Sequence, residues 1–295
     1  MLCGQSPDPD LPRLEISVAP NDSLLRQHVV LGHATHKGDK RSLLSNEQAT
    51  NMATTPLYLD DVYRRSAAAR VQDITDEGGI VLDATIFYPT SGGQPGDCGQ
   101  LSWGLDDKKG AIEIATTVKG DNDTIVLVPA EPASLPDKGA LVTQEIDWDR
   151  RYRHMRIHTA LHLLSVVIPL PVTGGAITQD KGRLDFDMPD APEDKAELEE
   201  TLNKLIACDF AVSEEWITEA ALDANPEMVK TLRAKPPRGA GRIRLVRIGA
   251  GDNTADLQPC GGTHVAGTQE IGPIRLGKIE KKGKQNRRVS LHLTS

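Results

Sequence analysis

Aromatic residues and long apolar runs are both scarce in this sequence. Phe, Trp and Tyr make up 3% of 295 residues against a hydrophobic content of 38%, so any core has to be mainly aliphatic. The chain is long enough for two domains with their own cores. No apolar run approaches the roughly 18 residues of a membrane-spanning helix, and the N-terminus lacks the basic-then-apolar pattern of a secretory signal. We therefore expect a soluble, cytoplasmic protein with no membrane partner.

Cysteine is also sparse, and its four positions are scattered. Cys3, Cys98, Cys208 and Cys260 do not have the spacing of a disulfide framework. In a reducing compartment such residues are buried thiols or metal ligands. Only Cys260 has a histidine at ligand spacing, in Cys260-Gly261-Gly262-Thr263-His264.

Basic residues are outnumbered, and the net charge of −8 argues against nucleic-acid binding by the chain as a whole. The distribution is uneven, however. Residues 228–295 carry 14 Lys/Arg against 4 Asp/Glu, which leaves 20 against 38 for the rest. A basic C-terminal part on an acidic body permits a nucleic-acid partner there, and ordinary charge segregation is the alternative.

The first half of the chain divides into two segments. Residues 1–51 mix Pro, Asp, Ser, Asn and Gln without a sustained period, which is typical of a disordered or poorly structured extension. Residues 52–146 contain short alternating or β-branched runs separated by Gly, Asp, Asn and Pro, which predicts an antiparallel β-barrel. The predicted strands are 80–82, 111–118, 124–128 and 141–146.

A glycine-rich loop interrupts these runs at Gly92, Gly93 and Gln94. Paired glycines let a loop adopt positive φ and approach another backbone or a ligand closely. No Gly-Lys-Ser/Thr follows, so this is not a phosphate-binding loop. A tight turn is the simpler interpretation.

Residues 147–295 indicate an α+β domain. An aspartate at the start can cap a helix that runs through His162 and ends before Pro169. A second helix is expected from Pro192 to about Cys208. The expected strands are 184–186, 210–217, 242–248, 274–279 and 289–293.

The run from Arg242 to Ile248 alternates basic and apolar residues. This predicts a strand with one buried face and one outward-facing cationic row. We expect a loop from there to Cys260.

Two imidazoles, His158 and His162, lie four residues apart, a spacing that places them on one face of a helix. Such a pair is as often core as half of a metal site. The distant Cys260 and His264 change this balance, because one thiolate with imidazoles makes a set suited to zinc. His154, one turn earlier, is expected to support the ligands or to lie on the helix surface.

The role of such a metal is open at this point. Four protein ligands would make a closed structural site, whereas catalysis needs an exchangeable position. The residue after His158 is Thr159, so the zinc-peptidase helix with its adjacent glutamate is absent.

Several motifs together carry a family resemblance. They are Ser91-Gly92-Gly93-Gln94, His158-Thr159-Ala160-Leu161-His162-Leu163-Leu164, Arg183-Leu184-Asp185-Phe186, Gln258-Pro259-Cys260-Gly261-Gly262-Thr263-His264-Val265 and Glu270-Ile271-Gly272-Pro273-Ile274, with the basic segment 281–288. In order and spacing the chain resembles the AlaX-type trans-editing proteins, which look like a free-standing editing domain of alanyl-tRNA synthetase. The resemblance covers about residues 58–293. The histidine pair joined to the Cys-Gly-Gly-Thr-His loop is its specific part.

The resemblance implies an α+β fold in two parts. A translation-factor-like antiparallel β-barrel (52–146) would precede an editing domain of the threonyl/alanyl-tRNA synthetase type (147–295). It also implies an aminoacyl-tRNA deacylase that hydrolyses serine or glycine wrongly esterified to tRNA for alanine. A ligase is not expected, because the chain is too short to add an aminoacylation domain.

The resemblance also implies site residues. One zinc ion would be held by His158, His162, Cys260 and His264. Thr159 and Gln179 are candidates for reading the amino acid or holding a water. The candidates for tRNA contact are Arg242, Arg244, Arg247, Lys281, Lys282, Lys284, Arg287 and Arg288. The alternative function is a non-catalytic tRNA-binding module with a structural zinc.

Overall fold

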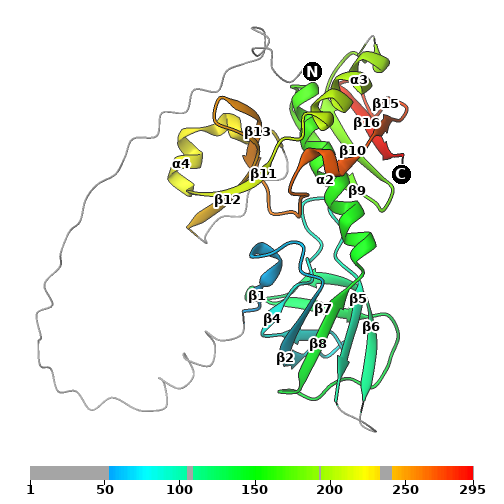
Figure 1. The fold of residues 1–295 in the computed structure, drawn as a ribbon, viewed down its shortest axis with the longest axis vertical. Helices are drawn as coiled ribbons and strands as arrows, with labels where there is room; N and C mark the ends of the chain where they lie inside the picture. The colour runs from blue at the N-terminus through cyan, green and yellow to red at the C-terminus, as the bar shows by residue number, and fades with distance from the viewer. Residues whose placement is uncertain (1–52, 105–108, 193, 233–240, 295) are drawn as a thin grey trace, which may run out of the picture. The chain divides into compact units, whose positions relative to one another are not determined.

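An antiparallel barrel followed by an α+β half makes up the described part of the chain (Figure 1). The computed structural model describes residues 53–104, 109–192, 194–232 and 241–294. The predicted extension 1–51 lies outside these residues. Within the described residues, every helix is too short or too polar to cross a membrane.

Six of the described strands close the barrel in the order β2-β3-β7-β6-β5-β8, and all of their pairings are antiparallel. A short parallel pair, β1 with β4, and one 3-10 turn lie beside it. The elements are β1 (Thr55–Pro56), the 3-10 turn (Leu57–Leu59), β2 (Ser66–Ile74), β3 (Ile80–Leu82), β4 (Ala84–Thr85), β5 (Gly99–Trp103), β6 (Gly110–Lys119), β7 (Ile125–Pro129) and β8 (Leu141–Ile146).

Side chains alternate between the barrel interior and solvent. In β8 the buried positions are Val142, Gln144 and Ile146, two residues apart, as a strand with one wet face requires. The barrel core is aliphatic apart from Phe87. The predicted antiparallel barrel is therefore confirmed, although β2 and β5 were not separately recognised in the sequence.

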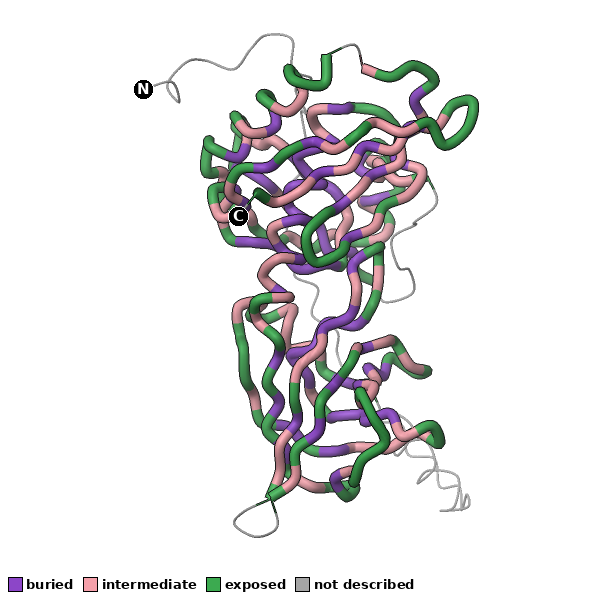
Figure 2. The backbone as a smooth tube through the Cα atoms, turned by 90° about the vertical axis from the view of Figure 1, so that its right-hand side faces the viewer, coloured by how far each residue is buried: buried purple, intermediate pink, exposed green. Residues whose placement is uncertain are grey.

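The α+β half contains two sheets, β14-β16-β10-β9 with β15 paired to β16, and β11-β12-β13. Figure 2 shows that buried residues run through this half as they do through the barrel. The elements are α2 (Trp148–Val167), β9 (Val172–Ile177), β10 (Lys181–Asp187), α3 (Lys195–Ala207), β11 (Val212–Thr218), α4 (Glu219–Ala224), a 3-10 turn (Pro226–Met228), β12 (Arg242–Ala250), β13 (Asn253–Pro259), a 3-10 turn (Thr268–Ile271), β14 (Ile274–Leu276), β15 (Glu280–Lys281) and β16 (Asn286–Leu293).

The long helix α2 begins where the sequence predicts. The side chain of Asp147 accepts a hydrogen bond from the backbone N–H of Arg150, which satisfies one donor of the first turn. The helix ends at Val167, two residues before Pro169. Most of its residues from Met155 to Ser165 are buried, so packing fixes its orientation.

Two expectations for the β11-β12-β13 sheet are wrong. The segment between Ile248 and Cys260 was expected to be a loop, but it contains β13, which forms a hairpin with β12. The cationic row on β12 does not exist either. Arg244 is buried, and Arg247 lies on the opposite face because it is an odd number of residues away.

A buried ion pair joins the barrel to α2. The Arg151 guanidinium binds the carboxylate of Asp97 and also donates to the carbonyls of Val62 and Ile86. Both charged side chains are almost completely buried. Asp97 lies in the segment that leads out of the glycine-rich loop, so this pair fixes that loop relative to the helix.

We expect Asp97→Asn to lower the free energy of unfolding by about 3–5 kcal/mol, because it leaves the buried Arg151 guanidinium without a counter-charge. Asp180→Asn is the matched control, since Asp180 pairs with Arg153 at the surface, where such pairs contribute about 0–1 kcal/mol. Urea unfolding followed by circular dichroism measures both. Equal losses in the two variants would contradict the assignment.

Candidate metal centre

The structure brings the four predicted ligands together. The donor atoms of His158, His162, Cys260 and His264 all lie within 4.8 Å of one another. Cys260 Sγ is 3.5 Å from His158 Nε2 and 3.3 Å from His264 Nε2. Nitrogen and sulfur ligands around a tetrahedral zinc ion are about 3.4–3.6 Å apart, from the usual bond lengths. The cluster therefore has the composition and spacing to hold one metal ion.

The first histidine is held by the glycine-rich loop of the barrel segment. His158 Nδ1–H donates to Gln94 Oε1 at 2.9 Å, which leaves Nε2 facing Cys260. The Gln94 amide is itself fixed, because Nε2 donates to Thr263 Oγ1 and Oε1 accepts from Thr263 N–H. Gln94 thus links both ligand-bearing segments, α2 and the Cys260–His264 loop.

The second histidine is held by a carboxylate. His162 Nδ1–H donates to Asp256 Oδ2 at 2.9 Å. Asp256 is buried and also accepts from Gln258 Nε2 and from Lys230 Nζ. Such carboxylate–histidine pairs fix the tautomer and ring orientation of a metal ligand.

The third histidine is held by a hydroxyl. The ring N–H at Nδ1 of His264 donates to Thr159 Oγ1 at 3.1 Å. Thr159 Oγ1 also accepts from Val265 N–H and donates to the carbonyl of Met155. The hydroxyl therefore uses its donor and both acceptor positions within the protein.

In this structure the buried Thr159 hydroxyl is therefore engaged in positioning His264. Its role in reading the amino acid or holding a water stays a prediction. Gln179 lies in the exposed turn between β9 and β10. Among the described residues, Gln179 is not one of those that hydrogen-bond to the four predicted ligands.

The Cys260–His264 loop is held in place by Arg244. Its Nη1 donates to the carbonyls of Cys260 and Gly262 at 2.8 and 2.9 Å, and its Nη2 pairs with Glu214. Arg244 is thus committed to the metal-site loop. Its predicted contact with tRNA phosphates stays a prediction.

The protonation of the cluster follows from burial and from its own contacts. Burial raises the pKa of a thiol, but the imidazoles of His158 and His264 outweigh this and lower the pKa of Cys260 well below its usual value. Burial lowers the pKa of His264 to about 3. Burial also acts to lower the pKa of His162, but hydrogen bonds to Asp256 and Cys260 raise it to about 9. The cluster therefore offers a thiolate and a neutral imidazole, and metal binding would release the proton of His162.

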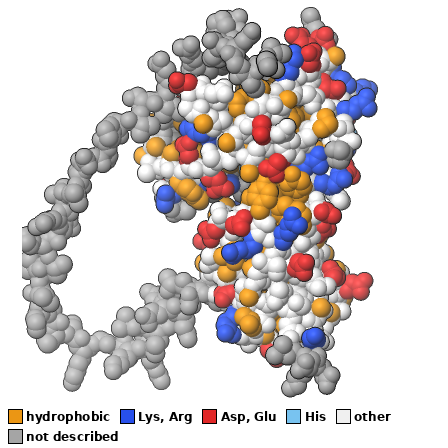
Figure 3. Space-filling view, viewed as in Figure 1, with side chains coloured by type: hydrophobic (Ala, Val, Ile, Leu, Met, Phe, Trp, Pro, Cys, Tyr) orange, Lys and Arg blue, Asp and Glu red, His pale blue; other side chains and the backbone are white. Residues whose placement is uncertain are grey.

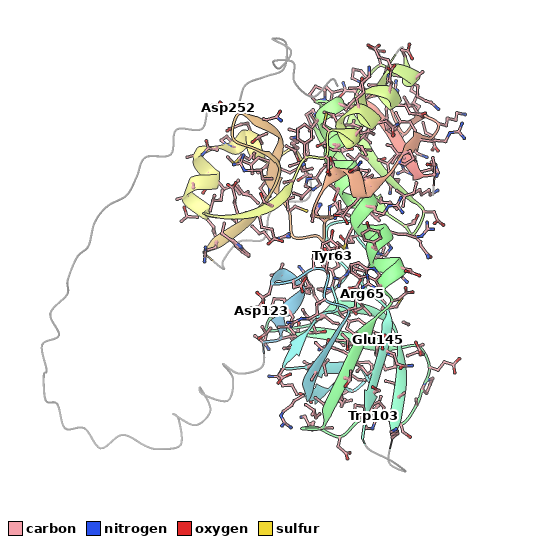
Figure 4. The ribbon with its side chains drawn as sticks, in the orientation of Figure 1. Tyr63, Arg65, Trp103, Asp123, Glu145 and Asp252 are labelled. Carbon is pink, nitrogen blue, oxygen red and sulfur yellow. The ribbon has the colours of Figure 1, made fainter. Side chains whose placement is uncertain are left out.

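A small hollow of about 100 Å³ adjoins the cluster, with His264 in its wall. Its volume is well below the roughly 300–1,000 Å³ of pockets for drug-sized ligands, so it suits a small group. The other lining residues are Val62, Tyr63, Val212, Ser213, Glu214, Arg244, Val246, Val265 and Ala266. Tyr63 lies at the connection between the barrel and the α+β half (Figure 4).

The remaining predicted residues fall into two groups. Lys281, Lys282 and Lys284 are exposed on the β15–β16 hairpin, where blue side chains gather at the upper right edge of Figure 3. Arg287 is buried and donates to the carbonyl of Pro189, and its tRNA contact stays a prediction.

Two of the other predicted arginines form ion pairs within the protein, and the third, Arg242, is exposed. Arg288 pairs with Asp185, and Arg247 pairs with Glu215. Arg242 is exposed at the start of β12. Of the predicted tRNA contacts, the three lysines and Arg242 are therefore the exposed ones.

The glycine-rich loop behaves as its composition predicts. Gly92 and Gly93 have φ of 56° and 85°, and a Cβ on Gly93 would lie 2.7 Å from the carbonyl oxygen of Gly175. The loop therefore needs glycine at Gly93 to approach β9 closely, and this approach places the neighbouring Gln94 against His158.

Sequence reasoning did not identify Asp256, Lys230 or the positioning role of Arg244. Asp256 could have been found from strand periodicity, because Asp256, Gln258 and Cys260 are spaced two residues apart and would lie on one face of a strand. That signal was lost when this segment was interpreted as a loop.

Two family models match the chain. "Threonyl and Alanyl tRNA synthetase second additional domain" matches residues 243–290, and "tRNA synthetases class II (A)" matches residues 29–150. The second match begins inside the segment 1–51, which was predicted to lie outside the resemblance.

Similar proteins are found among editing proteins and ligases. Over 242 residues the chain is 36% identical to "Alanyl-tRNA editing protein AlaX-M" of Methanosarcina acetivorans, covering 80% of this chain and 97% of that protein. It is 35% identical to "Alanyl-tRNA editing protein AlaX-L" of Pyrococcus horikoshii, covering 79% of this chain and 56% of that protein. It is 34% identical to "Alanine--tRNA ligase" of Pyrobaculum arsenaticum, covering 77% of this chain but 25% of that protein.

Adjacent glycines in the ligand loop provide a matched pair of substitutions. A Cβ on Gly262 would lie 2.1 Å from His158 Cε1, whereas a Cβ on Gly261 would meet nothing within 4 Å. We expect Gly262→Ala to displace the His158 ring and weaken zinc binding about 10- to 100-fold, the range seen when support for a ligand is lost. Gly261→Ala should keep the wild-type affinity.

Competition with a chromophoric chelator measures both affinities, and circular dichroism checks that each variant is folded. A Gly262→Ala protein that binds zinc as tightly as the Gly261→Ala protein would contradict the arrangement of His158 at this loop.

Proposed function

The chain belongs to the AlaX family of alanyl-tRNA editing proteins, as its motifs predict, and from this premise we propose that it is a zinc-dependent aminoacyl-tRNA deacylase. Its proposed substrate is tRNA for alanine misacylated with serine or glycine, hydrolysed in trans. The observation that carries the proposal is the convergence of three imidazole nitrogens and the Cys260 sulfur beside a small hollow. A ligase activity is not supported, because the match to the alanine–tRNA ligase covers a quarter of that protein.

The donor set supports zinc as the ion. One thiolate and three imidazoles form a borderline-soft tetrahedral set, and each imidazole has a fixed acceptor for its second N–H. Bound there, zinc would supply a positive charge that orients or polarises a group of the substrate. His158, His162, Cys260 and His264 would hold it.

The chain's own residues define where the ester is placed. Cys260 is the most exposed of the four ligands, and Gly261 beside it is exposed with open space around it. Substrate can therefore approach the cluster from this side. Water attack on the ester carbonyl breaks the bond to the ribose oxygen, releasing the amino acid and tRNA. Because such an ester is already activated, positioning contributes much of the rate.

The hollow supports a small acyl group. Four of its lining residues are valines, and Ser213 and Glu214 add polar groups. A serine substrate would bring a hydroxyl that these groups could bind. Selection of glycine over alanine rests on one methyl group, which contributes only about 1–3 kcal/mol. Serine is therefore the substrate for which this lining offers the larger discrimination.

We assign both parts of the chain to this activity. Residues 52–146 would form the translation-factor-like barrel domain and 147–295 the editing domain, with residues 1–51 as an extension. Gln94 supports the cooperation of the two, because it comes from the barrel segment and holds a ligand of the other. A substrate drawn from translation would place the protein in the cytoplasm.

The four-ligand set also favours a second candidate, a non-catalytic tRNA-binding module with a structural zinc. A tetrahedron filled by protein ligands has no exchangeable position, which is typical of structural sites. The two candidates differ in whether the ester is hydrolysed, so a deacylation assay separates them.

We expect the protein to release serine from Ser-tRNA(Ala) and to spare Ala-tRNA(Ala). Removal of the metal by a chelator and dialysis should abolish hydrolysis, and added zinc should restore it, because the ligands converge on one ion. Acid precipitation of labelled aminoacyl-tRNA measures the ester. Filter binding of uncharged tRNA and circular dichroism are run in parallel as controls.

Hydrolysis that persists after complete metal removal would contradict the zinc dependence. A zinc-loaded, folded protein that binds tRNA but leaves every ester intact would establish the non-catalytic alternative.

We further propose that the exposed lysines of the β15–β16 hairpin contact tRNA phosphates. Lys284→Gln should weaken tRNA binding and reduce the slope of log affinity against log salt by about one, since one phosphate contact is lost. Lys138→Gln is the control, because Lys138 lies on the barrel and pairs with Asp73. Filter binding across a salt series measures both slopes, and equal slopes would contradict the proposal.

A further inference from the structure

Trp216 is an exposed tryptophan in a chain with few aromatic residues. It lies in β11 with 45% of its surface exposed, whereas Trp103 and Trp148 are half-buried. Large apolar side chains at the surface are informative when they gather at a functional site. The position of Trp216 on its sheet places it at one.

The β11-β12-β13 sheet carries Trp216 on the same face as the candidate metal centre. Trp216 is directly opposite Arg244 on β12, and the carbonyl of Arg244 accepts a hydrogen bond from the backbone N–H of Cys260, just after β13. Residues that face each other across antiparallel strands point to the same side. Trp216, Arg244 and Cys260 therefore form one row, and two strand spacings place Trp216 about 10 Å from Cys260.

The two faces of this sheet have different neighbours. The opposite face is covered by an apolar cluster that includes Ile243, Leu245 and Leu222 of α4. On the face of Trp216, Glu214 and Arg244 line the hollow that adjoins His264. Trp216 does not line the hollow itself, but it lies directly across the strand pair from Arg244, which does.

Arg242 gives this surface a positive charge. Its guanidinium lies 5.6 Å from the centre of the Trp216 ring, and it shares the face because it is two residues from Arg244. An indole beside a guanidinium is the combination that binds nucleotides, since the ring stacks on a base and the cation attracts a phosphate.

We propose that Trp216 and Arg242 form a stacking platform for the 3′-terminal nucleobase of tRNA. This inference rests on the proposed function, since it names how the ester would be delivered to the centre. The ester is carried on the terminal ribose, so base and ester are separated by one sugar. The backbones of Trp216 and Cys260 lie about two strand spacings, roughly 10 Å, apart, so one nucleotide can reach from the platform to the centre.

Binding of uncharged tRNA tests the platform independently of catalysis. Two ligands are compared, tRNA(Ala) with its complete 3′ end and the same tRNA lacking only the terminal nucleotide. The wild-type protein should bind the complete tRNA more tightly. Trp216→Ala should weaken binding of the complete tRNA by roughly 5- to 150-fold, the range for loss of one stacked base, and leave binding of the shortened tRNA unchanged. Trp216→Phe should keep most of the affinity.

Leu141→Ala is the matched control, because it truncates another exposed apolar residue, on β8 of the barrel. It should change neither affinity. Circular dichroism and urea unfolding check that all variants are folded. Because no ester is used, failure of the deacylation assay leaves this comparison intact.

Two results would overturn the proposal. One is a Trp216→Ala protein that binds the complete tRNA as the wild type does. The other is an equal loss for complete and shortened tRNA, which would place the contact elsewhere on the nucleic acid. If Trp216→Ala instead abolishes self-association in sedimentation and leaves tRNA binding unchanged, the surface is an interface between copies of the chain.

Discussion

Three imidazoles can share one ion only if each turns one ring nitrogen toward it and bonds the other elsewhere, and the rest of this centre depends on that constraint. Each Nδ1–H is given a different acceptor, the Gln94 amide, the Asp256 carboxylate and the Thr159 hydroxyl. A core histidine needs one partner of any kind. Here three histidines bond through Nδ1 and leave Nε2 free to face the sulfur of Cys260. This arrangement favours a metal site over coincidental burial, because without an ion the four buried donor atoms would have few bonding partners.

These acceptors come from distant parts of the chain, so the centre requires the whole described unit to fold. Gln94 comes from the barrel segment, and its loop is anchored to α2 through Asp97 and Arg151. Asp256 comes from a strand that also positions Cys260 by register. A shift of the barrel would therefore move His158 through two contacts, the Asp97–Arg151 ion pair and the hydrogen bond from His158 to the Gln94 amide. The barrel segment thus contributes directly to the geometry of the site.

The sequence predicts the ligands well and their surroundings poorly, for a physical reason. Local spacing is sufficient for His158 and His162, since helix geometry alone puts them on one face. Arg244 shows the limit. Alternation assigns a residue to a face, but it does not say whether that face meets water or another segment, and here the face meets the ligand loop. Thr159 bonds to His264 and Gln94 bonds to Thr263, and both of these partners lie more than 100 residues away in the sequence. No local sequence pattern can therefore predict these contacts.

The size of the hollow limits what the centre can do alone. A space of about 100 Å³ admits an acyl group of a few atoms, and burial of so small a group contributes little binding free energy. In the proposed reaction, most of the affinity would therefore come from contacts with the tRNA outside the hollow. Binding energy from a non-reacting part of a substrate can hold the ester in place for attack. In the proposed reaction the hollow would have only to distinguish acyl groups delivered to it, and a surface that fixes the end of the tRNA would determine which atoms reach the candidate metal centre.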